Sequence, residues 1–113
     1  MNIAQRAAGN VMIVDVNGQI KLGDGDILLR DKLQSLIQQG HKQLVLNLAG
    51  VNYIDSSGLG EIAHAYVTVS RQGGQLKLAG LTKRLKDLLT ITKLLTVFES
   101  FDTDAEAVDS FAP

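Results

Sequence analysis

One short apolar run, Leu44-Val45-Leu46-Asn47-Leu48, constrains the fold of this chain more than any other segment. The run has the length of a β-strand, and its apolar residues stand next to one another instead of alternating with polar ones. That pattern is typical of a strand covered on both faces, because a strand with one face in water alternates between the two residue classes. We therefore expect this segment to be a central strand of a β-sheet.

A helix is predicted before this strand. Apolar residues recur there at the three- and four-residue spacing of one helix face, at Leu29, Leu33, Leu36 and Ile37. Gly40 stands where a glycine commonly ends a helix. Asp24 or Asp26 is expected to cap the start, because Asp is a favoured N-cap residue. The segment is thus predicted to be amphipathic.

A second helix and a further strand are predicted after the central strand. Apolar side chains again follow helical spacing from Leu59 as far as Gly73-Gly74, and residues 75–79 then alternate like a strand. A strand, a crossover helix and another strand in so short a stretch form a parallel βαβ unit. The two strands are therefore expected to lie side by side and parallel.

The N-terminal segment is predicted to be a β-hairpin. Residues 3–6 and the apolar residues 11–16 have strand character, and the break Ala8-Gly9-Asn10 separates them. The second of these strands is expected to end at Asn17-Gly18. Adding this hairpin to a parallel unit gives a mixed sheet.

The C-terminal segment is predicted to hold two helices with a short strand between them. Thr82 is expected to cap the first, and Thr103 with Glu106 forms a capping box for the last. Val97-Phe98 is the candidate edge strand. The apolar residues of segment 94–101 either pack under the last helix or form an exposed surface for a partner.

These elements predict one α/β domain over residues 1–113, with a mixed, mainly parallel sheet and helices packed largely on one side. Hydrophobic residues make up 45% of the chain and charged ones 20%, which is ordinary for a globular protein with a single core. The formal net charge is −1 without a basic cluster, which disfavours direct nucleic-acid binding.

The cellular location expected from composition is the cytoplasm. The chain has no cysteine, so it forms no disulfide and offers no thiolate metal ligand. Its first residues lack the apolar segment of a signal peptide, and the run from Val11 to Val16 is short and contains Asp15. No membrane insertion is therefore predicted.

The segment Asp55-Ser56-Ser57-Gly58-Leu59-Gly60 has the most chemical information, because it places two hydroxyls and a carboxylate at the start of the second helix. The first N–H groups of a helix have no partner within it and the helix dipole is positive there, so a phosphoryl group on Ser57 would be favoured. The two glycines are expected to leave the loop open to another protein. The alternative interpretation is plain helix capping by Asp and Ser.

This segment resembles the signature of STAS domains, specifically of the anti-sigma factor antagonists, and the resemblance extends over nearly the whole chain. It implies that Ser57 is the phosphoacceptor for an anti-sigma factor that is also an ATP-dependent serine kinase. It also implies a switch in which the unphosphorylated chain binds that kinase and a sigma factor is released. The resemblance further implies that phosphorylation ends the binding and that a phosphatase removes the phosphoryl group again. Asp55, Ser56, Gly58, Leu59 and Gly60 would form the partner-binding loop around Ser57.

The chain departs from the family pattern before its first helix, where Lys21 replaces a residue that is usually acidic. Parallel strands open on the same rim, so this segment is expected near the Ser57 loop. Asp24 and Asp26 are further candidates for partner binding, and their alternative role is a glycine-rich turn with an N-cap. Two other functions stay open: a constitutive docking subunit of a transporter or sensory complex, and a sensor of a nucleotide or lipid phosphate.

No catalytic residue, metal site or cofactor is predicted. Asp24-Gly25-Asp26 lacks the later ligands of a calcium loop, and His41 and His64 lack ligand partners at metal-site spacing. Ser57 is not in a Gly-x-Ser-x-Gly elbow, which argues against a hydrolase. The chain is therefore expected to be a binding module and not an enzyme.

Overall fold

The computed structural model describes residues 1–111, in which two initial strands are followed by helices and strands in alternation, five strands and four helices in all. The strands are β1 (Asn2–Ala8), β2 (Val11–Ile20), β3 (Gln43–Ile54), β4 (Gln75–Ala79) and β5 (Ser100–Phe101). The helices are α1 (Asp26–Gln38), α2 (Ser56–Arg71), α3 (Lys83–Ile91) and α4 (Asp104–Asp109). No helix within residues 1–111 combines the length and the hydropathy needed to cross a bilayer.

The strands form one mixed sheet in the order β1-β2-β3-β4-β5. β1 and β2 pair antiparallel, whereas β2, β3, β4 and β5 run parallel to one another. The predicted hairpin, the central place of the Leu44–Leu48 segment and the parallel βαβ unit are thereby confirmed. The mainly parallel arrangement brings the C-terminal ends of β2 and β3 to the same rim of the sheet.

β2 and β3 extend further than the sequence predicted, and their extra residues build this rim. β2 continues beyond Asn17-Gly18 to Ile20 through register shifts, and β3 continues to Ile54. Gly18 has a positive φ of 106°, which suits glycine at such an irregularity. Ile20 consequently lies opposite Ile54, directly before the segment that contains the two serines.

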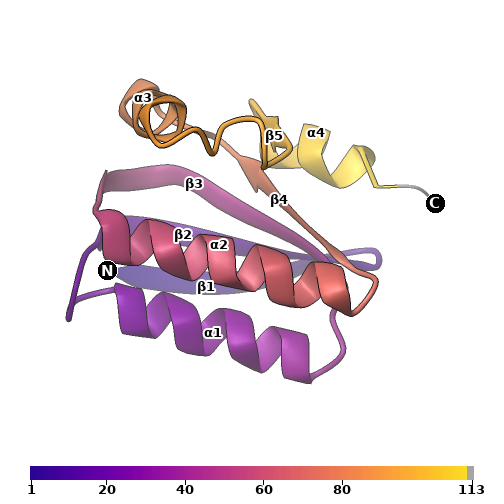
Figure 1. The fold of residues 1–113 in the computed structure, drawn as a ribbon. Coiled ribbons are helices and arrows are strands. Elements are labelled where there is room, and N and C mark those ends of the chain that lie inside the picture. Colours follow the sequence, from indigo (N-terminus) through magenta and orange to yellow (C-terminus); the bar gives the residue numbers. More distant parts are fainter. Residues whose placement is uncertain (112–113) are drawn as a thin grey trace.

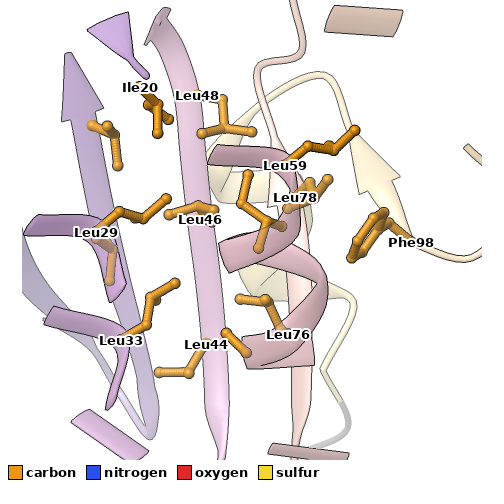
Figure 2. Packing of buried hydrophobic residues seen from close by; sticks show 14 of the residues in the cluster. Ile20, Leu29, Leu33, Leu44, Leu46, Leu48, Leu59, Leu76, Leu78 and Phe98 are labelled. Atoms are coloured by element: carbon orange, nitrogen blue, oxygen red, sulfur yellow. The ribbon is translucent and has the colours of Figure 1, made fainter. Parts of the chain in front are cut away.

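Most helices cover one face of the sheet, as predicted. α1 and α2 lie side by side across that face, and α4 lies with β5 on the far side of the molecule from α1 (Figure 1). Leu44, Leu46 and Leu48 of β3 belong to the same buried cluster as Leu29 of α1 and Leu59 of α2 (Figure 2). The residues that pack on the opposite face include Val45, Ala107 and Phe111. β3 is therefore covered on both faces.

The start of α1 differs from the prediction. Its N-cap is Gly25, with a φ of 111°, and neither aspartate occupies that position. Asp26 is instead the first helical residue, and its buried carboxylate accepts hydrogen bonds from the N–H groups of Gly23 and Ile27. A Cβ at position 25 would lie 2.5 Å from the Gln19 carbonyl oxygen, so this tight turn requires glycine.

The C-terminal segment confirms the capped helices but not the edge strand. Thr82 and Thr103 are N-caps whose hydroxyls accept backbone hydrogen bonds. The predicted strand Val97-Phe98 is wrong, because the edge strand is β5 and Phe98 is buried in the core, with its ring centroid 5.2 Å from that of Tyr66. Val97 stays exposed, so segment 94–101 divides between core and surface.

Candidate functional site

The two serines lie at the N-terminus of α2, immediately after the central strand and the Asp55 N-cap. The Asp55 carboxylate accepts a hydrogen bond from the Gly58 N–H at 3.0 Å. Ser56 is exposed and Ser57 is half-buried. The predicted placement of a carboxylate and two hydroxyls at a helix N-terminus is confirmed. Asp55 therefore caps α2, and Ser57 stands half-buried in the first turn of the helix.

Asp55 also connects this helix start to the segment between β2 and α1. Its second carboxylate oxygen accepts a hydrogen bond from the Leu22 N–H at 2.9 Å, and its own N–H donates to the Ile20 carbonyl at 3.1 Å. The pKa of the Asp55 carboxyl lies below its usual range because the carboxylate accepts hydrogen bonds. The bond from Leu22 contributes most, and the bond from Gly58 contributes second. The carboxylate is thus ionised at neutral pH and anchors two loops.

The segment from Lys21 to Asp26 lies beside the serine loop, as the strand order predicted. It is a compact turn, in which Lys21 and Asp24 exchange backbone hydrogen bonds of 3.2 and 2.9 Å. The Lys21 ammonium lies 4.0 Å from the exposed Asp24 carboxylate, so Asp24 partly offsets the positive charge at this position. Asp24 therefore faces solvent at the rim, whereas Asp26 points inward and shapes the turn.

The three residues after Ser57 have different environments, and the expectation that both glycines leave open surface is half wrong. Gly58 is buried, and a Cβ there would lie 2.6 Å from Cγ2 of Ile20 and 2.9 Å from Cγ1 of Ile54. Leu59 is buried in the core. Gly60 alone of the three is exposed, and a Cβ added to it would meet no atom within 4 Å. Gly58 hence permits close packing of α2 against β2, and Gly60 permits approach from outside.

Two exposed apolar residues at this rim were missed by the sequence reasoning. Leu22 is 74% exposed and Tyr53 is 42% exposed. Together with Gln19, Lys21 and Asp55 they line a shallow hollow. Two features of the sequence could have indicated them: a leucine inside an otherwise polar, glycine-rich turn, and a tyrosine shortly before the Asp-Ser-Ser motif. The rim thus combines apolar and acidic groups around the serines.

The histidine of α2 is not part of this rim. His64 lies seven residues beyond Ser57, about 10 Å along the helix axis. It lines a groove between α1 and α2 with Arg30 and Glu61. Within the part of the chain that the structure describes, no three His, Cys, Asp or Glu side chains are arranged to hold a metal ion.

Known proteins are similar to this chain in sequence over most of its length. A profile of the STAS domain family matches residues 2–107. The anti-sigma-B factor antagonist of Bacillus subtilis (strain 168) is 35% identical over 99 residues, which span 88% of this chain and 89% of that protein. The similarity therefore covers the serine segment and most of the fold around it.

Solved structures show the same fold at lower identity. An anti-sigma factor antagonist from Mycobacterium paratuberculosis superimposes with a TM-score of 0.86 at 19% identity, covering 96% of this chain and 92% of the other. The Bacillus cell fate determinant SpoIIAA in its phosphorylated form gives a TM-score of 0.76 at 17% identity, with 96% and 97% covered.

Proposed function

Because the chain belongs to the STAS domain family, we propose that it is an anti-sigma factor antagonist whose partner binding is controlled by phosphorylation of Ser57. The observation that carries the proposal is the position of Ser57 in the first turn of α2, next to the carboxylate of Asp55 and at an open rim of the sheet. The helix dipole and the N–H groups of the first turn favour a phosphoryl group at this place.

In the proposed cycle the unphosphorylated chain binds an anti-sigma factor that is an ATP-dependent serine kinase, and a sigma factor is released. The kinase transfers the γ-phosphoryl group of ATP to the Ser57 hydroxyl oxygen, the hydroxyl proton leaves, and ADP is the second product. A phosphatase restores the free hydroxyl by hydrolysis. The chain itself is the substrate of both reactions and has a regulatory, non-catalytic role.

The charge of the phosphoryl group explains how modification ends binding. It adds a charge of about −1.5 to −2 at neutral pH. Each unit of that charge held ~5 Å from a like charge in the partner costs about 3 kcal/mol at an effective dielectric constant of about 20. This corresponds to roughly a hundredfold loss of affinity. A local change of charge is therefore sufficient without refolding of the domain.

The proposed partner surface comprises the exposed groups of the rim. Ser56 and Gly60 flank Ser57, Asp55 lies between the two loops, and Asp24 presents its carboxylate to solvent. Gly58, Leu59 and Asp26 support this surface from beneath, because all three are buried. Their substitution would alter binding through the shape of the loops and not through direct contact.

The proposal is tested by intact-mass measurement and peptide mapping of the protein isolated from its native cells under several growth and stress conditions. The expected result is one added phosphoryl group, located at Ser57 and absent from a Ser57→Ala variant. Ser56→Ala is the matched control, since it removes the adjacent hydroxyl and should retain the phosphate.

A binding measurement completes this test. The unmodified chain should bind the kinase-type anti-sigma factor of the same cells in the presence of a non-hydrolysable ATP analogue, and the phosphorylated chain should bind about a hundredfold more weakly. Phosphate at no serine under any condition, with equal binding of both forms, would contradict the proposal and favour a constitutive docking subunit. Strong thermal stabilisation by a free nucleotide would instead favour a phosphate sensor.

A further inference from the structure

A single carboxylate joins the two loops at the rim. One oxygen of Asp55 accepts the Gly58 N–H at 3.0 Å, within the first turn of α2. The other oxygen accepts the Leu22 N–H at 2.9 Å, across 33 residues of sequence. The loop that contains Ser57 and the turn that contains Leu22 therefore share one anionic acceptor.

The side-chain hydrogen bond between the Leu22 turn and the start of α2 runs through this acceptor. Internal hydrogen bonds close the turn, between Lys21 and Asp24 and from the Gly23 N–H to Asp26. The Leu22 N–H, in contrast, donates to another element, and the leucine side chain is 74% exposed at the tip. The carboxylate thus holds a closed turn that presents a large apolar side chain to solvent.

We propose that Asp55 is a positioning residue through which phosphorylation of Ser57 acts on the Leu22 turn: the phosphoryl group displaces the Asp55 carboxylate, and the Leu22 N–H loses its acceptor. This inference rests on the proposed function and specifies the regulation of the same site. Its consequence is that a partner encounters two changes on phosphorylation, a new negative charge beside α2 and a released apolar turn beside β2.

Competition for the same donors produces the displacement. A phosphoryl group on Ser57 would accept hydrogen bonds from the N–H groups at the start of α2. Asp55 already accepts a hydrogen bond from one of these groups, the Gly58 N–H. Two anions at one helix N-terminus also repel each other. The Asp55 main chain is fixed by its hydrogen bond to the Ile20 carbonyl, so the side chain relieves the repulsion by rotation, and rotation breaks the contact with Leu22.

The ionisation state of Asp55 supports the same inference. Hydrogen bonds from Leu22 and Gly58 hold the pKa of this carboxyl below its usual range in the unmodified chain, so the group that a phosphoryl group on Ser57 meets is an anion.

The experiment installs phosphoserine at position 57 by genetic-code expansion in the full chain and measures amide hydrogen exchange by NMR. The Leu22 amide is expected to exchange about tenfold faster than in the unmodified chain, the factor that corresponds to loss of one charge-assisted hydrogen bond. Phosphoserine at position 70, which is exposed near the C-terminal end of α2, is the matched control, and the Leu46 amide in β3 is the internal reference. Both should show less than about a twofold change.

An Asp55→Asn variant separates positioning from simple capping. Asparagine is as good an N-cap as aspartate, but its single side-chain oxygen does not occupy both acceptor positions. The variant should retain α2. Even without phosphate, its Leu22 amide should exchange about tenfold faster than the Leu22 amide of the parent chain. Phosphoserine at position 57 should then produce no further increase.

Two outcomes would overturn the inference: an unchanged Leu22 amide in the chain with phosphoserine at 57, or a full phosphate effect that persists in the Asp55→Asn background. Because the phosphoserine is installed without a kinase, neither outcome bears on whether cells phosphorylate Ser57. Conversely, an absence of phosphate in cells would refute the proposed function and leave this coupling as measured.

Discussion

The substitution Gly58→Ala tests the close contact of α2 with the end of β2. An added Cβ would lie 2.6 Å from Cγ2 of Ile20 and 2.8 Å from the Ile20 carbonyl oxygen. The second contact involves the backbone, and the same carbonyl accepts the N–H of Asp55, so rotation of a side chain does not relieve it. Overpacking of this kind costs about 1–3 kcal/mol.

The helix itself opposes this cost, because alanine is favoured over glycine within a helix by about 1 kcal/mol. The net expectation is a free energy of unfolding lowered by roughly 0–2 kcal/mol. Gly60→Ala is the matched control in the same helix. It is exposed, and no atom lies within 4 Å of its added Cβ, so it should raise the free energy of unfolding by about 0.5–1 kcal/mol.

The assay is equilibrium unfolding in urea, followed by circular dichroism, for the parent chain and both variants. A common slope with denaturant shows that the three chains unfold in the same way, which permits direct comparison of the midpoints. The reasoning would be refuted if Gly58→Ala were as stable as Gly60→Ala. The opposite signs are the essential prediction, since both changes add the same methyl group two residues apart.

Three further predictions concern the core, a cap and an ion pair, and all are measured by urea unfolding. Leu46→Ala, at a fully buried position of β3, should lower the free energy of unfolding by about 2–5 kcal/mol, and a loss below about 1 kcal/mol would contradict its central placement. Thr82→Ala should cost about 1 kcal/mol, because its hydroxyl accepts the Leu85 N–H, and no loss would show that the cap is dispensable. The Arg6 guanidinium beside Asp15 lowers the pKa of that carboxyl in the folded chain. The ion pair therefore contributes stability above the unfolded-state pKa of about 3.9. This contribution is lost as the pH falls through the lower folded-state pKa. The stability difference between the parent chain and Asp15→Asn should therefore shrink on acidification below about pH 4, and a difference independent of pH would refute this assignment.

Elements defined by local patterns were predicted well. The N-caps Thr82 and Thr103 follow from hydrogen bonds between a side chain and the backbone three residues later. β4 was predicted with its observed bounds because apolar and polar residues alternate between a glycine turn and the next cap. The helix start at Asp55 also depends on a contact between residues three positions apart.

Elements defined by neighbours in space were predicted less well. β2 was expected to end at Gly18, because Asn-Gly is a local turn signal, yet pairing with β3 extends it to Ile20. Phe98 was assigned to a strand by its apolar neighbours, but packing against Tyr66 places it in the core instead. In both cases tertiary contacts outweigh local propensity.

The kinds and order of the main elements, the central strand and the position of two serines at a helix start are all encoded locally, because each depends on residues close together in the chain. Three features required the folded chain: Gly58 is closed while Gly60 is open, Asp26 points inward, and Asp55 accepts a hydrogen bond from Leu22. The physical reason is that parallel β2 and β3 end at one rim, where residues 33 positions apart come within hydrogen-bonding distance.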